Sequence, residues 1–199
     1  MKDLVEEGCE CAAHGLHHDG RLFSDPRLFE ERMVIIHSWA ARMGIVGFRS
    51  PSMLRDEVLM RRLPFLWDSS FPAWDPFQPQ PGGCGRYEPF LLSPGLVELP
   101  VTVWQDYTIF EELGSRDISL WKSQISQIHR AGGLINMIVH PDYMSGGRRL
   151  GLFNELLEYL SELPGAEFRL PRELAQEFLA RSEKASADDG HQVTQHRVP

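Results

Sequence analysis

The amino-acid sequence predicts an α/β fold in which parallel strands are joined by helical crossovers. Two observations predict it: helix-like and strand-like segments alternate along most of the chain, and the strand-like segments are short apolar runs. The chain has 199 residues, 42% of them hydrophobic, which is enough apolar material for one sizeable core. We expect a folded domain over residues 1–181 and a disordered tail over residues 182–199, which are polar and have little to bury.

The first half of the chain is expected to begin its regular structure with a helix over residues 26–43. Asp25 followed by Pro26 is a typical helix start, and Gly44 is a typical stop, with apolar residues near helical spacing between them. The pattern then indicates a short buried strand over 45–49, a helix over 52–63, a strand over 65–68 and a long loop rich in proline and glycine over 72–86.

The second half contains the clearest strand signal, over residues 134–139. This run is almost continuously apolar, so we expect it to be buried on both faces. The other elements expected here are a strand over 96–103, a helix over 119–131 that Gly132 and Gly133 end, a helix over 150–163 and a last helix over 172–180.

Composition and charge exclude several classes of partner. A formal net charge of −8 repels phosphate backbones, so we expect no nucleic-acid partner. No apolar run reaches the length of a membrane helix, and the first residues lack the apolar core of a signal peptide. Three cysteines fit a reducing compartment better than a disulfide framework, which favours the cytoplasm, and the oligomeric state stays open.

Four polar side chains stand where predicted strands end: Arg49, Asp68, Asp106 and His140. In parallel α/β folds, chemistry collects at the carboxyl ends of the strands. A histidine there suits acid–base work, and an arginine suits binding of an anion. Each also has a structural interpretation, as a surface arginine before a helix, a histidine that caps a strand, or aspartates that cap loops.

The most chemically suggestive segment is Cys9–Asp19, in which His14 and His18 are four residues apart. On one helical turn this spacing brings two imidazoles onto one face, where they can bind a cation such as zinc. Spacing alone leaves open that one histidine is an ordinary surface residue. A further alternative is a closed zinc site in which Cys9 and Cys11 join the two histidines, although the Cys-x-Cys spacing is tight.

Five motifs, taken in order, resemble the polysaccharide deacetylase family, also called the NodB-homology group or carbohydrate esterase family four. They are Gly8–Asp19, Gly47–Pro51, Trp67–Pro72, Glu98–Pro100 with Asp106, and Ile138–Pro141. The resemblance implies that residues 1–181 form a distorted (β/α)7-type barrel. It also implies a metal-dependent hydrolase that removes acetyl groups from an N-acetylated or O-acetylated carbohydrate.

The resemblance also implies roles for particular residues. His14 and His18 correspond to the family's metal ligands, for Zn2+ or another divalent ion. His140 corresponds to the general acid that protonates the leaving amine, and Asp106 to the residue that orients it, although Asp68 could take that place. Arg49 corresponds to the arginine that pairs with the catalytic aspartate.

One departure from the family concerns its first strand, which carries an Asp-Asp pair that supplies the base and the third metal ligand. No such strand precedes His14, so we expect an N-terminally truncated and incomplete barrel. Asp19, Asp68 and Asp142 stay open as the third ligand. The alternatives to an active deacetylase are an inactive remnant that binds carbohydrate or metal weakly, and a structural α/β module with a Cys/His zinc site.

Overall fold

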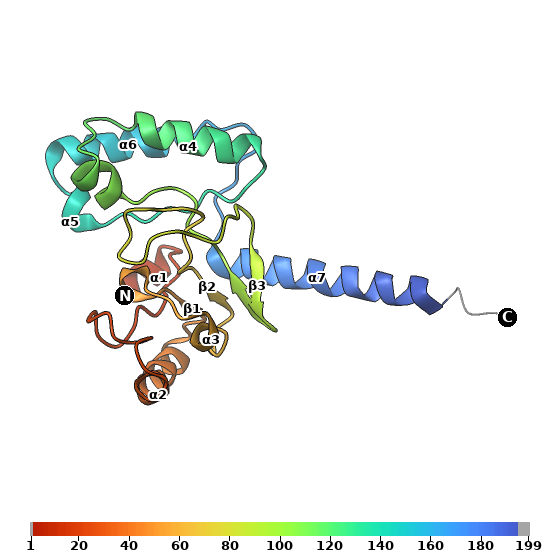
Figure 1. Ribbon diagram of the computed structural model, residues 1–199. Helices are drawn as coiled ribbons and strands as arrows, with labels where there is room; N and C mark the ends of the chain where they lie inside the picture. The colour runs from red at the N-terminus through yellow and green to blue at the C-terminus, as the bar shows by residue number, and fades with distance from the viewer. Residues whose placement is uncertain (1, 195–199) are drawn as a thin grey trace.

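The computed structural model describes residues 2–194, with side chains described for residues 3–185, and shows a mixed α/β structure (Figure 1). The helices are α1 (Lys2–Glu6), α2 (Pro26–Met43), α3 (Glu57–Met60), α4 (Ser119–Arg130), α5 (Pro141–Met144), α6 (Gly147–Ser161) and α7 (Pro171–Thr194). The strands are β1 (Gly47–Phe48), β2 (Trp67–Asp68), β3 (Phe90–Ser93) and β4 (Leu96–Glu98), with a 3-10 turn η1 (Pro51–Met53) and a π-helical turn η2 (Thr108–Glu112).

The four strands form one sheet in the order β1-β2-β4-β3. β1 pairs with β2 and β2 pairs with β4, both in parallel, whereas β3 pairs with β4 in antiparallel orientation. The hairpin that joins β3 to β4 turns at Gly95, whose φ of 80° favours glycine. Strand β3 is absent from the sequence-based expectation, because it depends on antiparallel pairing with β4.

Backbone hydrogen bonds extend the parallel arrangement beyond the assigned strands. The N–H of Ala13 donates to the carbonyl of Gly47, and the N–H groups of Thr102 and Val103 donate to the carbonyl of Asn136. Five extended segments therefore follow one another in chain order, and their carboxyl ends meet at one edge. No closed barrel is seen within residues 2–194, so the (β/α)7-type barrel stays a prediction.

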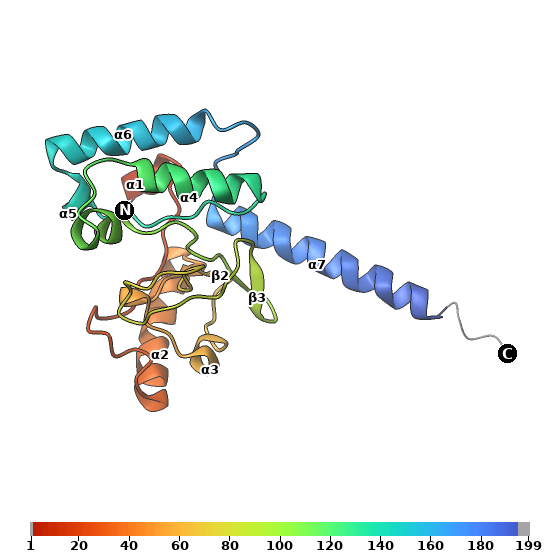
Figure 2. The ribbon, with the colours of Figure 1, turned by 45° about the horizontal axis from the view of Figure 1, so that its top comes forward.

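Helices cover the extended segments from several sides. Helix α2 packs Phe29, Met33 and Ile36 against a core that includes Phe48 of β1. Helices α4 and α6 lie side by side and share a second core, centred on residues such as Trp121 and Leu156 (Figure 2). The first turns of α7 pack Ala175 against Trp67 and Val97, and the rest of this helix extends away from the molecule (Figures 1 and 2).

Glu10 ties the N-terminal segment to β2 and to α7. Its side chain is only 3% exposed. Its carboxylate accepts hydrogen bonds from Nε1 of Trp67 and from the backbone N–H of Arg172, both at 2.9 Å, and Nε of Arg172 lies 3.2 Å away. A buried carboxylate needs such donors, so Glu10 fixes three elements that are far apart in sequence.

The expected helix over 26–43 is confirmed in full by α2. Asp25 accepts a hydrogen bond from the backbone N–H of Leu28, and Gly44 ends the helix in the left-handed conformation. The expected helices over 119–131 and 150–163 correspond to α4 and α6. Residues 72–86 contain no helix or strand, in agreement with the expected loop.

Three expectations about secondary structure differ from the structure. The helix expected over 52–63 is wrong, because Ser52 and Met53 have positive φ angles and only Glu57–Met60 is α-helical. Residues 134–139 are each half-buried, and not buried on both faces as expected. Helix α7 continues to Thr194, into the expected tail, because Glu183, Lys184 and Ala185 favour helix even without burial. Residues 195–199 lie outside the described part.

Candidate functional site

A cavity of about 740 Å³ lies at the carboxyl ends of the parallel segments. Its lining includes His14, His18, Arg49 and His140, which are four of the five site residues expected from the sequence. The fifth, Asp106, is fully buried and contacts His140 from behind the wall. A second hollow of about 860 Å³, between α7 and residues 132–135, contains a single histidine, His129, and no comparable cluster.

The two histidines of the first motif are close together, but not for the expected reason. Residues 10–19 are not helical, so the helical-turn explanation for His14 and His18 is wrong. Their ring centroids nevertheless lie 5.4 Å apart. The turn depends on Gly15, whose φ is +77° and whose added Cβ would lie 2.7 Å from Cγ of Pro51.

The imidazole of His14 is held in one tautomer by the backbone. Its Nδ1 lies 2.9 Å from the carbonyl oxygen of Arg49, so Nδ1 carries the proton and Nε2 keeps its lone pair. Burial lowers the pKa of His14, the bond to the Arg49 carbonyl opposes this, and the nearby positive charges of His18, Arg49 and His140 lower it further. A neutral ring with a free Nε2 is the form that binds a metal.

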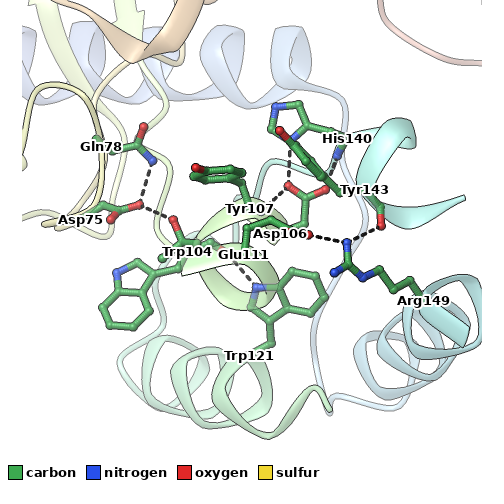
Figure 3. Close-up of polar contacts among 11 residues, drawn as sticks. Asp75, Gln78, Trp104, Asp106, Tyr107, Glu111, Trp121, His140, Tyr143 and Arg149 are labelled. Atoms are coloured by element: carbon green, nitrogen blue, oxygen red, sulfur yellow. Dashed lines mark hydrogen bonds and ion pairs between the residues drawn. The ribbon is translucent and has the colours of Figure 1, made fainter. Parts of the chain in front are cut away.

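His140 and Asp106 form a hydrogen-bonded pair at the same cavity (Figure 3). Nδ1 of His140 lies 2.7 Å from Oδ1 of Asp106, and the backbone N–H of His140 donates to Oδ2 at 2.5 Å. Oδ1 also accepts from the backbone N–H of Tyr107 at 2.8 Å. Among the described residues nothing hydrogen-bonds to Nε2 of His140, so this nitrogen is available for proton transfer.

Aromatic rings surround this pair. The ring centroid of Tyr143 lies 5.5 Å from that of His140 and 5.5 Å from that of Tyr107 (Figure 3). Arg149 donates to the backbone carbonyl of Tyr143 at 3.2 Å and pairs with Glu111 at 2.6 Å. Sequence reasoning missed the contributions of Tyr143, Glu111 and Arg149, since no spacing connects them.

Further polar contacts fix the loops next to this wall. Nε1 of Trp121 donates to the carbonyl of Trp104 at 2.6 Å, which attaches helix α4 to the segment before Asp106 (Figure 3). On the other side, buried Asp75 accepts a hydrogen bond of 2.8 Å from Gln78, which itself lines the cavity. The loop over 72–86 is therefore anchored where it borders the site.

Arg49 is half-buried at the floor of the cavity. Its Nε donates to the carbonyl of Ser69 at 2.8 Å, and its Nη2 donates to the hydroxyl of Ser69 at 2.7 Å. Burial lowers the pKa of Arg49, while the nearby carboxyl groups of Asp68 and Glu98 raise it. No carboxylate within the described residues forms a direct ion pair with Arg49, so the aspartate partner implied by the resemblance is not seen there.

The structure distinguishes among the aspartates that the sequence left open as the partner of His140 or as the third metal ligand. Asp106, and not Asp68, contacts His140, whereas the hydrogen bond that Asp68 accepts comes from the hydroxyl of Ser70. Both oxygens of Asp19 are bonded to Arg32, at 2.7 and 2.6 Å. Asp142 is the one candidate third ligand of the three that lines the cavity. Cys9 and Cys11 are not part of the lining.

The donor set fits a divalent metal in part. His14 and His18 supply two nitrogen donors, whereas catalytic zinc sites use three protein ligands. No group of three or more potential ligands is found within the described residues. No helix in that same part of the chain is long and apolar enough to cross a membrane.

Comparison with known proteins adds no relative: no family model, no curated protein and no solved structure matches the chain. The site therefore has to be interpreted from its own geometry.

Proposed function

We propose that the protein is a metal-dependent hydrolase that removes acetyl groups from an N-acetylated or O-acetylated carbohydrate. In the N-acetylated case it acts on a non-peptide carbon–nitrogen bond. The observation that carries the proposal is the pairing of His140 with buried Asp106 across one cavity from His14 and His18. Hydrolysis of an acetyl group needs a proton donor and an electrophile on opposite sides of the carbonyl, and this arrangement supplies places for both.

The chain's own residues account for the proton that reaches the leaving group, whereas the attacking water would release its proton to solvent as its pKa is lowered. In its protonated form, His140 gives the Nε2 proton to the leaving nitrogen or oxygen as the bond to the acetyl carbon breaks. Asp106 holds the ring in the correct tautomer through Nδ1 and stabilises the imidazolium. The positive charge of Arg49 at the cavity floor stabilises negative charge that develops on the acetyl oxygen.

His14 and His18 are the residues that would hold the metal. A divalent ion bound there supplies Lewis-acid polarisation and a water of lowered pKa. The contribution of the protein is to keep His14 neutral, which burial does, and to orient its ring, which the carbonyl of Arg49 does.

The rest of the cavity suits a sugar. Phe77, Tyr107 and Tyr143 line it and offer apolar faces to a pyranose ring. Gln78 and Gln105 line it as well and offer amide groups to hydroxyls. A carbohydrate therefore meets both kinds of contact in this one cavity.

A second candidate function is a catalytically inactive protein that binds metal or carbohydrate weakly. The observation that favours it is the incomplete donor set, with two histidines and no third ligand clustered with them in the described residues. The two candidates predict the same binding but different turnover.

Acetate release from zinc-loaded protein tests the proposal. We expect hydrolysis of one member of a panel of chito-oligosaccharides, acetylated xylan and peptidoglycan fragments, with His140→Ala reducing the rate by about 10²–10⁴. His37→Ala, on the exposed face of α2, is the matched control and should leave the rate unchanged. Zinc bound at His14 and His18 without acetate release from any member would replace the proposal with the inactive binder.

A further inference from the structure

Two acidic side chains lie inside the sheet, beneath the cavity, and the proposed chemistry uses neither. Asp68 ends β2 and Glu98 ends β4, and they are register partners on adjacent parallel strands. Both are 0% exposed. Buried carboxyl groups are costly unless they are paired or hydrogen-bonded, so their bonding has to be accounted for atom by atom.

Each carboxyl group has one oxygen that is satisfied by neighbouring donors. Oε1 of Glu98 accepts from the backbone N–H groups of Ser70 and Phe71, at 3.1 and 2.9 Å. Oδ1 of Asp68 accepts from the hydroxyl of Ser70 at 2.6 Å. The other two oxygens, Oδ2 of Asp68 and Oε2 of Glu98, are buried, and no donor N–H or O–H of another described group reaches them.

A proton held between these two oxygens satisfies both of them at once. The two residues are register partners on adjacent parallel strands, and each carboxyl group acts on the pKa of the other. Two such ionised carboxylates in the protein interior repel each other strongly, as in paired-carboxylate sites that share one proton. The one arrangement that leaves no buried oxygen unbonded has one neutral acid and one carboxylate.

We propose that Glu98 stays protonated and donates to Asp68, and that this acid pair is a positioning unit that holds the Arg49–Ser50 corner of the cavity. The connection runs through Ser70. Its hydroxyl donates to Asp68 and accepts the backbone N–H of Ser50 at 2.8 Å. Buried hydrogen bonds through Ser70 thus connect the Arg49–Ser50 corner to the acid pair.

The corner needs such support because its backbone is strained. Directly after Ser50 and Pro51, Ser52 and Met53 have φ angles of 53° and 52°, in the left-handed region that disfavours residues with a side chain. Such conformations are costly and persist only where the surroundings impose them. Ser52 and Met53 both line the cavity, so the acid pair shapes a wall of the site.

Two arginines lie near the pair, and neither guanidinium donates a hydrogen bond to its carboxyl oxygens. Arg49 and Arg55 face it, and the thiol of Cys84 lies nearby. The N–H groups of Arg55 donate to backbone carbonyls and not to either carboxyl group. Burial raises the pKa of Glu98 well above its ordinary value, and the charge of Asp68 and its hydrogen bond raise it further.

The first test is the protonation state. Infrared difference spectra of the wild type and Glu98→Gln at pH 7 should show a protonated carboxyl band that the variant lacks. The glutamine amide can donate to Asp68 while its oxygen keeps both backbone N–H donors, so the variant should fold like the wild type. If the wild type has no such band, both groups are ionised and the shared proton is wrong.

The second test is the dependence of stability on pH. With a raised pKa in the folded state, Glu98 contributes stability that is fully present below its unfolded pKa of about 4.3 and is lost as the pH rises toward the folded pKa. The urea midpoint of the wild type should therefore fall, relative to that of Glu98→Gln, as the pH rises above about 4. Equal pH dependence in the two proteins would overturn the assignment.

The third test is the positioning role, read by hydrogen exchange of residues 49–54. Glu98→Met has similar length but no hydrogen bonds, and it should raise the exchange rate of this segment at least tenfold, whereas Glu98→Gln should keep it at the wild-type value. If both variants exchange like the wild type, the pair does not hold the corner. If Glu98→Met does not fold, the test rests on Glu98→Gln. Faster hydrogen exchange of residues 49–54 in that variant would then contradict the positioning role.

Discussion

Two hydrogen bonds join His140 to the carboxylate of Asp106. One comes from Nδ1 of the His140 ring, at 2.7 Å, and the other from the backbone N–H of His140, at 2.5 Å. This double contact fixes the ring relative to the chain that carries it. The carboxylate is completely buried, so neither bond competes with water. The same geometry predicts how substitutions at the site and in the loops beside it affect activity, zinc binding and stability.

The first prediction concerns Asp106→Asn. The amide places an N–H₂ group where the carboxylate now accepts N–H donors, so His140 loses its orientation. We expect the rate of acetate release to fall by about 10²–10⁴, with a smaller change in KM. Asp117→Asn, at the start of α4, is a control that should change neither. Wild-type turnover in Asp106→Asn would show that the pair has no role in proton transfer.

The second prediction concerns zinc binding. His14→Ala and His18→Ala should each weaken zinc affinity by 100-fold or more, since loss of outer partners alone costs about 10–100-fold. Cys9→Ser should bind zinc like the wild type, because Cys9 is exposed and outside the cavity lining. Titration with a competing chelator measures all three. Loss of zinc in the cysteine variant would favour the structural Cys/His site instead.

The third prediction concerns Gly15→Ala. A side chain here meets a φ of +77° and a contact of 2.7 Å with Pro51, so we expect both lower stability, by about 1–2 kcal/mol, and weaker zinc binding. Gly44→Ala is the matched control, with a φ of +66° and no atom within 4 Å. It should lower the urea midpoint and leave zinc affinity unchanged. If Gly15→Ala and Gly44→Ala bind zinc equally well, the turn at Gly15 is not needed for the zinc site.

The fourth prediction concerns the loop that carries His18. The guanidinium of Arg32 holds the pKa of Asp19 far below its ordinary value. A lowered pKa contributes stability that is present above about pH 4 and is lost as the pH falls. Asp19→Asn should therefore show a smaller loss of stability between pH 5 and pH 2 than the wild type, and lower stability at pH 7. Acid titrations followed by circular dichroism measure this difference, and equal titrations would contradict it.

Sequence reasoning predicted those elements whose signals are local. Helix α2 begins and ends as expected because Asp25 and Gly44 are caps that act within one turn. The helix expected over 52–63 failed because the left-handed angles of Ser52 and Met53 depend on contacts with residues far along the chain. Strand β3 was missed because it depends on antiparallel pairing with β4, and the residues of β3 alone do not indicate that pairing.

The same distinction applies to the candidate site. The resemblance grouped His14, His18, Arg49, Asp106 and His140, and the structure places four of them around one cavity with the fifth behind it. Glu98 lies in one of the five motifs but no role was predicted for it, because only the register of β2 and β4 brings it to Asp68. Residues that only the tertiary fold brings together have no fixed separation in the sequence, so a sequence pattern cannot predict that they pair.

The bond between Glu10 and the backbone of Arg172 closes a loop of 162 residues. During synthesis, Glu10 and Trp67 emerge long before Arg172, so the bond from Glu10 to helix α7 forms only when almost the whole chain is available. The floor of the sheet is thus completed last, and contacts of such long range slow folding. Chains stalled on the ribosome before residue 171 should leave the underside of β2 and β4 open to chaperones.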